Sequence, residues 1–161
     1  MQKINQPQGR LHLKITDPGG ALISERRARN IVLRQGAEII AALFSGAAEA
    51  SPISLVQVGF ATEGATVETT ALTLPEDASI PGTALVSPVA PGDFSVVSDR
   101  PGMVQVLIAS VFKPTVELKD VTEAGLLANG KLYNQVVFEP VTLRPGQDIT
   151  FFWEIDFPFG H

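Results

Sequence analysis

The chain of 161 residues contains no cysteine, and its two histidines are His12 and His161. The first absence excludes disulfides, thiolate nucleophiles and thiolate zinc sites. Neither histidine has a partner in the sequence that would orient it, so a Ser-His-Asp triad is poorly supported. The sequence also lacks Gly-x-Ser-x-Gly, a phosphate-binding glycine loop and His-Glu-x-x-His. We therefore expect no catalytic residues, no cofactor and no bound metal.

The chain also contains few charged residues. Charged residues make up 18% of the chain and apolar residues 45%, whereas roughly one quarter of a soluble domain is charged. So few charges cannot coat the whole surface, and we expect a partner to cover part of it. The net charge of −5 argues against nucleic acid as the partner, because phosphate binding needs clustered Lys and Arg. No apolar run approaches a membrane span, and the polar first ten residues predict a product made in the cytoplasm.

Alternation of apolar and polar residues predicts mainly β structure. Residues 10–16 and 21–24 flank a Pro-Gly-Gly turn and predict a hairpin, and 53–60 and 103–112 predict two further strands. The segment 148–157 alternates most clearly. Its apolar side consists of Ile149, Phe151, Trp153, Ile155 and Phe157. The strand spacing predicts an antiparallel β-sandwich whose C-terminal half is a three-strand meander.

One segment has the period of an amphipathic helix, which we place at about residues 31–45. Asn30 would be its N-cap and Gly46 the residue that ends it. With the last strand, this helix supplies the predicted core. The core residues are Val32, Ile39, Ile40, Leu43, Phe151, Trp153 and Ile155.

The predicted organisation is a flexible arm at 1–9, a single sandwich domain at 10–157 and a short tail at 158–161. Within the domain, residues 61–102 are rich in Pro, Gly, Thr and Ser. A region this long is either an extended arm that a partner orders or a set of short strands within the sandwich. Both interpretations stay open at this point.

The segment 121–140 contains a tight-turn signal, Asn129-Gly130, between two apolar runs. Glu123 and Gly125 precede that turn within a predicted strand. No set of partner residues converges on Glu123 in the sequence. We therefore interpret Glu123 as an acceptor of backbone N–H groups at a bulge, and Gly125 as the residue that allows positive φ or a close backbone approach.

The segment 25–29 holds the one basic cluster. It can pair with acidic groups of a neighbouring subunit, or it can be a solvated strand edge that prevents unwanted pairing. Glu154 and Asp156 fall on one face of the last strand, where alternating acidic residues usually form a solvated face. The candidate subunit contacts are Arg26, Arg27, Arg29, Phe157 and Phe159.

In three stretches the chain resembles a family of small structural proteins of tailed bacteriophages and prophages. The stretches are RNIVLRQGAEIIAALFSG, ISLVQVGFATEGATVETTALTLP and VTEAGLLANGKLYNQVVFEPVTLRPGQDITFFWEIDF. Leu127 stands where the family usually has Phe, and residues 75–102 do not align. The matching positions include Asn30, Gly36, Ile40, Leu43, Gly46, Val58, Gly59, Thr62, Thr70, Leu72, Thr122, Glu123, Ala124, Gly125, Leu126, Gly130, Leu132, Trp153 and Ile155.

This resemblance implies a non-enzymatic β-sandwich component of a virion, assembled in the cytoplasm of the bacterial host. Its partners would be other virion structural proteins and further copies of itself. A tail, baseplate, neck or fibre-attachment position is the leading interpretation. A capsid decoration (cement) protein is the first alternative, and a carbohydrate- or receptor-binding module is the second. The resemblance also implies that Glu123 and Gly125 belong to the fold.

Overall fold

The structure is a computed structural model that describes residues 8–64 and 66–160. The described part is mainly β and contains one α-helix, as predicted. Its elements, in order, are β1 (Gln8–Thr16), β2 (Leu22–Val32), α1 (Arg34–Ser45), β3 (Leu55–Gly59), η1 (Gly82–Leu85), β4 (Val86–Pro88), η2 (Pro91–Asp93), β5 (Phe94–Arg100), β6 (Met103–Phe112), β7 (Leu118–Ala128), β8 (Lys131–Leu132), β9 (Asn134–Leu143) and β10 (Asp148–Pro158).

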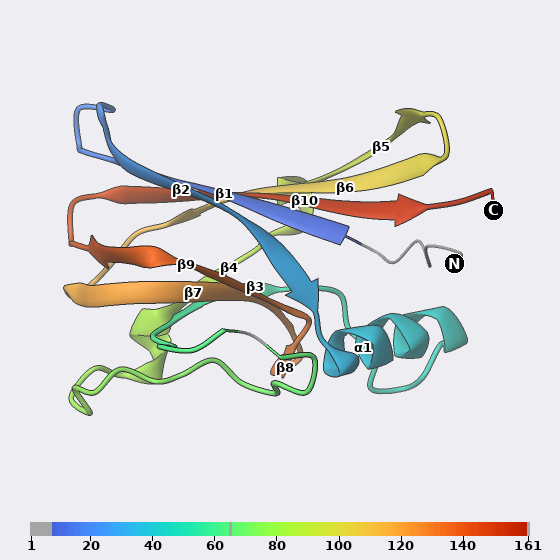
Figure 1. Ribbon diagram of the computed structural model, residues 1–161, viewed down its shortest axis with the longest axis horizontal. Helices are drawn as coiled ribbons and strands as arrows, with labels where there is room; N and C mark the ends of the chain where they lie inside the picture. The colour runs from blue at the N-terminus through green and yellow to red at the C-terminus, as the bar shows by residue number, and fades with distance from the viewer. Residues whose placement is uncertain (1–7, 65, 161) are drawn as a thin grey trace.

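A single antiparallel sheet curls back on itself to form two layers (Figure 1). The strand order is β4-β3-β7-β9-β2-β1-β10-β6-β5, and β8 pairs with β7. We call β2, β1, β10, β6 and β5 the β1 layer, and β9, β7, β3 and β4 the β7 layer. Strand β2 connects them, because most of it pairs with β1 whereas Ile31 and Val32 pair with β9. The predicted sandwich-like β fold is thereby confirmed.

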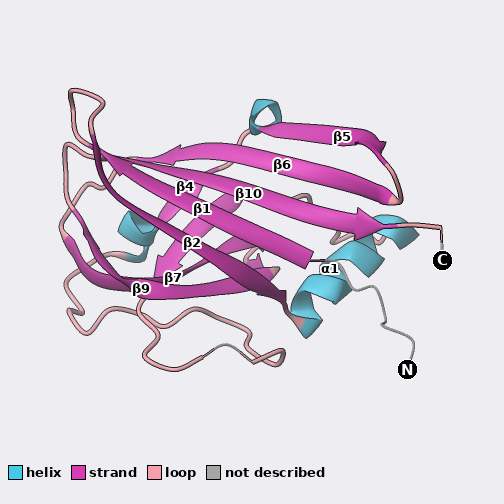
Figure 2. Cartoon of the chain, turned by 45° about the horizontal axis from the view of Figure 1, so that its top comes forward, coloured by secondary structure: helices cyan, strands magenta, loops and turns pink. Residues whose placement is uncertain are grey.

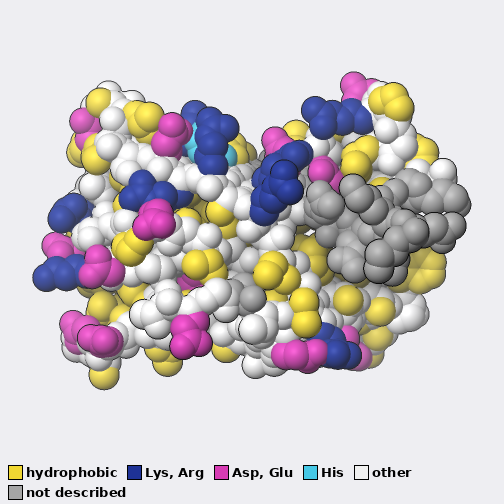
Figure 3. Space-filling view, in the orientation of Figure 1, with side chains coloured by type: hydrophobic (Ala, Val, Ile, Leu, Met, Phe, Trp, Pro, Cys, Tyr) yellow, Lys and Arg dark blue, Asp and Glu magenta, His cyan; other side chains and the backbone are white. Residues whose placement is uncertain are grey.

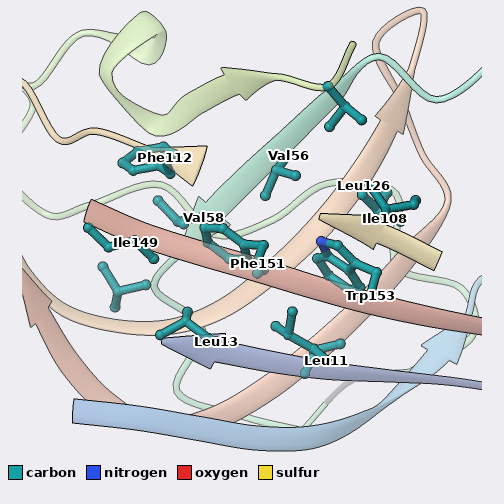
Figure 4. Packing of buried hydrophobic residues seen from close by; sticks show 14 of the residues in the cluster. Leu11, Leu13, Val56, Val58, Ile108, Phe112, Leu126, Ile149, Phe151 and Trp153 are labelled. Atoms are coloured by element: carbon teal, nitrogen blue, oxygen red, sulfur yellow. The ribbon is translucent and has the colours of Figure 1, made fainter. Parts of the chain in front are cut away.

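Side chains from both layers fill the space between them (Figure 4). Phe151 and Trp153 of β10 stack with ring centroids 6.3 Å apart and an interplanar angle of 8°. They face Val56 and Leu126 of the β7 layer, and all four are at most 1% exposed. Ile155 continues the same side of β10 and is also buried. The alternation of β10 therefore places its apolar side inward, since successive side chains of a strand point to opposite faces.

Helix α1 begins later than predicted, at Arg34. The prediction of Asn30 as N-cap is wrong, because Asn30 pairs with Gly9 of β1 and the next two residues pair with β9. Sheet pairing thus holds the chain extended up to Val32. The helix ends as predicted at Gly46, whose φ of 69° lets the chain turn back and cap the last carbonyls.

The helix lies at the end of the sandwich where β2 finishes (Figure 2). It docks closely, since a Cβ on Gly36 would lie 2.0 Å from the Tyr133 carbonyl oxygen. Ile39 is buried, and Ile40 is partly buried against the core. The prediction of Leu43 as a core residue is wrong, because Leu43 is 46% exposed. It follows Ile39 on the same face, but it belongs to the last turn, where the helix extends past the ends of β7 and β9 (Figure 1).

Residues 61–102 form short strands and a covering segment. Residues 60–64 and 66–81, which we call the covering segment, run along the outer side of the β7 layer (Figure 1). The chain then forms β4 at one edge of the sheet and β5 at the other. The second of the two interpretations, short strands within the sandwich, therefore describes 86–88 and 94–100.

The predicted C-terminal meander is wrong. Strand β9 pairs with β7 and β2, whereas β10 pairs with β1 and β6, because the turn at 144–147 carries the chain from one layer to the other. The predicted termini also need correction. Gln8 and Gly9 belong to β1, Pro158 belongs to β10, and the Phe159 N–H donates to the Gly102 carbonyl. Residues 1–7 of the predicted arm and the final residue of the predicted tail lie outside the described residues.

Candidate functional site

Glu123 on β7 is completely buried, with 0% of its surface exposed. Its Oε1 accepts the backbone N–H of Thr73 at 2.6 Å, and its Oε2 accepts a side-chain N–H of Gln135 at 2.6 Å. Thr73 belongs to the covering segment and lies 50 positions away in the sequence. The carboxylate therefore fastens the covering segment to the sheet, since a buried acceptor stabilises what it binds only when it is satisfied.

Two glycines make room for this arrangement. Gly59 of β3 pairs with Glu123, and a Cβ on Gly59 would lie 2.4 Å from the Glu123 Oε1. A Cβ on Gly125 would lie 2.5 Å from the Asn134 carbonyl oxygen. The φ of Gly125 is not positive, so of the two predicted reasons for this glycine the close backbone approach applies.

The local geometry around Glu123 agrees only in part with the sequence interpretation. The pairing of β7 with β9 does shift register between Leu118 and Val121 and again before Glu123, as at a bulge. The donors to the carboxylate, however, come from the covering segment and from Gln135, and the bulge donates to neither oxygen. The turn at Asn129 and Gly130 has positive φ at both residues, 48° and 77°, which is the geometry that Asn-Gly favours.

A second, small core lies beneath the covering segment. It consists of Leu33, Leu72, Leu127 and Leu132. Thr122 adds a further attachment, because its hydroxyl donates to the Ala61 carbonyl at 2.6 Å. Thr122 and Glu123 thus both bind the covering segment. No group of three His, Asp or Glu suited to a metal occurs in the described part of the chain, and Glu123 has no exposed surface at which a substrate could reach it.

The outer face of the β1 layer is open and hollowed by a groove of about 700 Å³. We call it the basic groove. In Figure 3, Lys and Arg side chains gather along the upper margin on either side of a notch. The groove is lined by Arg10, Leu11, His12, Lys14, Arg27, Ala28, Arg29, Phe152 and Glu154.

Strand register brings these residues together from three strands. His12 of β1 lies opposite Arg27 of β2 on one side and opposite Phe152 of β10 on the other. Arg10 lies likewise between Arg29 and Glu154. Because opposite residues in paired strands share a face, the polar sides of β1, β2 and β10 form one surface.

Several groups in the groove are already paired. Arg10 binds Glu154 at 2.8 Å and approaches Asp156 at 3.5 Å. The hydrogen bond from His12 to Glu25, at 2.7 Å, holds the pKa of Glu25 below its ordinary value. Lys14 lies over the Phe152 ring at 5.6 Å, within reach of a cation–π interaction.

Asp156 departs from the predicted solvated face. It is 9% exposed and accepts a side-chain N–H of Gln105 at 2.8 Å. Glu154, its neighbour two residues earlier, is only half-buried and pairs with Arg10. The outer face of β10 is thus partly buried, and Asp156 helps to join β10 to β6.

The basic cluster of the sequence is divided by strand alternation. Arg26 points away from the groove and donates to the carbonyls of Glu139 and Pro140 at 3.0 and 2.9 Å, so it ties β2 to β9. Arg27 and Arg29 line the groove, exposed, and neither has an ion pair or hydrogen bond within the described residues. Of the five candidate subunit contacts, Arg27 and Arg29 are therefore the two whose positive charges are free to bind a partner.

The other two candidate subunit contacts, Phe157 and Phe159, differ in burial. Phe157 is partly buried and packs against the main core, whereas Phe159 is 51% exposed. Sequence reasoning missed Arg10, Lys14 and Phe152 as companions of Arg27 and Arg29. The signal was present in the alternation of 10–14 and 25–29, but only the register of three strands shows that these side chains share one surface.

Comparison of the chain with protein-family models, with curated proteins and with solved structures finds no match. Within residues 8–64 and 66–160, no helix has both the length and the apolar character needed to cross a membrane.

Proposed function

We propose that this chain is a non-enzymatic structural subunit of a tailed-phage virion or a related phage-like particle. It is present in several copies at the tail, baseplate, neck or fibre-attachment region, where it binds neighbouring copies and other virion proteins. The observation that carries the proposal is the structural role of Glu123. The most conspicuous acidic residue of the family-like motif is fully buried, and both of its oxygens hold the fold together.

Other motif positions support the same interpretation. Gly36 seats the helix on the Tyr133 carbonyl, Gly59 leaves room for the Glu123 carboxylate, and Gly125 allows close approach to Asn134. Each of these contacts determines shape, and none presents a reactive group to solvent. The motif is therefore best interpreted as the signature of a fold, which is what a family of structural proteins would share.

Exposed apolar side chains give such a subunit surfaces to bury against neighbours. They cluster at the end of α1, where Leu43 and Phe44 are 46% and 94% exposed. Two more lie in the covering segment, where Val67 and Leu74 are 52% and 67% exposed. Apolar surface of this kind, in a chain poor in charge, is typical of proteins that assemble.

The proposal is tested by locating the chain in purified particles from the producing bacterium, by mass spectrometry and cryo-electron microscopy. Density for this sandwich at symmetric positions on the tail or neck is the expected result. Copies on the shell and none on the tail would assign it instead to head decoration. Absence of the chain from all particles would contradict the proposal.

The basic groove favours one second candidate, a carbohydrate- or receptor-binding module. Phe152 is 39% exposed there, beside charged side chains that could bind sugar hydroxyls or carboxylates. A glycan-array signal that is lost in Phe152→Ala, with particle assembly intact, would support this candidate. Absence of any signal from the wild-type protein would dismiss it.

A further inference from the structure

The charge of this molecule is unevenly distributed between its two outer faces. The lining of the basic groove contains four Lys or Arg residues and one Glu. The whole chain has 12 Lys and Arg and 17 Asp and Glu, so eight cationic and 16 acidic residues remain elsewhere. An acidic protein thus carries a basic groove on one face, and any surface that fits this groove should be acidic.

Within the groove, Lys14, Arg27 and Arg29 have no ion pair among the described residues, and Lys14 already lies over the Phe152 ring. Arg10 is engaged by Glu154, whereas no described residue pairs with Arg27 or Arg29. They are two positions apart on one strand, so their attachment points are roughly 7 Å apart and face the same way. Beside them Phe152 is 39% exposed. The groove therefore offers the two exposed arginines, with Lys14 and the phenyl ring beside them.

The covering segment on the opposite side of the molecule has the complementary character. Leu74 is 67% exposed there, and Glu76 and Asp77 follow it, both exposed and without an ion pair among the described residues. The side chain and backbone of Ser79 donate to Asp77, and these hydrogen bonds hold its pKa below the ordinary value. Figure 3 shows acidic side chains at the lower margin, where this segment runs, on the opposite side of the molecule from the basic groove.

We propose that the occupant of the basic groove is the covering segment of a second copy of this chain. Glu76 and Asp77 of one copy face Arg27 and Arg29 of the next, and Leu74 covers Phe152. The inference rests on the multi-copy role proposed above and names the surfaces that the copies use. Because the two surfaces lie on opposite sides of the molecule, the contact is head-to-tail and repeats into a ring or an open stack.

A second copy fits the groove better than a uniformly anionic polymer does. Glu25 and Glu154 stand in or beside the groove, and Asp156 approaches Arg10. These carboxylates would repel a continuous row of phosphates. A short segment with two carboxylates beside an apolar residue meets the two unpaired arginines, Lys14 and the phenyl ring.

The test is sedimentation velocity of the purified full-length protein at low and high salt, with charge-reversed variants. We expect association at about 50 mM NaCl and dissociation at about 1 M, where screening is nearly complete. One variant is Arg27→Glu/Arg29→Glu. The other is Glu76→Lys/Asp77→Asn, in which the amide keeps the acceptor for Ser79. Each variant alone should associate on the order of 100-fold more weakly than the wild type.

Mixing the two variants gives the sharpest result. The acidic segment of the first variant fits the unchanged groove of the second, and the altered surfaces also carry opposite charges. The mixture should therefore restore association with equal numbers of the two chains. The matched control is Glu49→Lys/Lys131→Glu, which alters two exposed charges outside the groove lining and outside residues 74–77 and should associate like the wild type. Circular dichroism confirms that every variant is folded.

Wild-type protein that stays monomeric at low salt would overturn the inference, and so would variants that associate like the wild type. Binding of oligodeoxythymidylate or an oligouronate that is lost in Arg27→Glu/Arg29→Glu, without any self-association, would assign the groove to a different ligand and overturn it as well. Failure of the proposed function is distinguishable. Copies that stack in solution but are absent from particles contradict that function alone, whereas monomers that still enter particles contradict only the stacking.

Discussion

The two outer faces of this sandwich are built from the same kind of antiparallel strand and are used in opposite ways. On the β7 layer, the covering segment closes the face and Glu123 is satisfied by Thr73 and Gln135. On the β1 layer, Arg27 and Arg29 stay exposed beside Phe152. The difference shows that a charged residue in a motif can serve the fold entirely, while less conspicuous charges two strands away remain free for binding.

Trp153→Ala should have the largest effect, because it acts on the core that supports both faces. Trp153 is 1% exposed, and removing a large buried side chain costs roughly 3–5 kcal/mol in the free energy of unfolding. Urea denaturation followed by far-UV circular dichroism measures the loss, since the only tryptophan is gone. A loss below about 1 kcal/mol would mean that Trp153 does not lie between the layers.

Glu123→Ala should open the covered face alone. It leaves the Thr73 N–H and the Gln135 amide without their acceptor. Gln135 is buried, and a buried unpaired group costs roughly 1–3 kcal/mol, so a loss of roughly that size is expected. The covering segment should also become sensitive to proteases. Limited proteolysis with mass spectrometry locates the cleavage, and cuts outside residues 60–81 would contradict the assignment.

Glu123→Gln is the matched control for that experiment. The new amide keeps one acceptor oxygen for Thr73, and Gln135 has an Oε1 without a partner among the described residues. Reversal of the Gln135 amide would therefore restore the second hydrogen bond. Glu123→Gln should lose clearly less stability than Glu123→Ala, and equal losses would show that the negative charge is required.

High pH should weaken the fold through Tyr133, the only tyrosine. Burial raises the pKa of Tyr133 from 10.0 to about 12. The folded state therefore keeps the phenol neutral after the unfolded chain has ionised. The associated stability is fully present below pH 10 and is lost as the pH rises toward 12, a loss of roughly 2–3 kcal/mol.

Ultraviolet absorbance of tyrosinate follows this titration directly. The folded protein should ionise well above a tyrosine-containing model peptide. Ionisation at the same pH as the peptide, with the protein still folded by circular dichroism, would show that Tyr133 is accessible to solvent.

Arg27→Ala/Arg29→Ala should have the smallest effect on stability. Neither arginine has a partner among the described residues, so the change in unfolding free energy should stay within about 0.5 kcal/mol. Arg26→Ala is the informative comparison, because Arg26 donates to two carbonyls of β9. Thermal denaturation should show a lower midpoint for Arg26→Ala than for the double variant, and the reverse order would contradict the division of the basic cluster.

Local patterns in the sequence were sufficient for features that depend on neighbouring residues. The alternation of β10 predicted the buried side of Phe151, Trp153 and Ile155, and the Asn129-Gly130 pair predicted a turn with positive φ at both residues. Gly46 was likewise recognisable as the end of the helix. In each case the determining interaction spans only a few positions, so its signal is contiguous.

Features that depend on distant strands were not predictable in this way. Asn30 looked like an N-cap, but pairing with Gly9 and the start of β9 keeps that part of the chain extended. Leu43 has the right helical period, yet β7 and β9 end before the last turn of the helix. The contact of Glu123 with Thr73 spans 50 positions, and the groove needs the register of β1, β2 and β10 together. Contacts between segments far apart in the sequence determined all four of these features.

The most direct test of this account is amide hydrogen exchange at Thr73, measured by NMR. Thr73 lies outside the strands, so its N–H would exchange rapidly if Glu123 did not hold it. We predict that it exchanges slowly in the wild-type protein, at rates close to those of β7, and rapidly in Glu123→Ala. Rapid exchange in the wild type, at the rate of the exposed loop residue Glu76, would contradict the claim that Glu123 belongs to the fold.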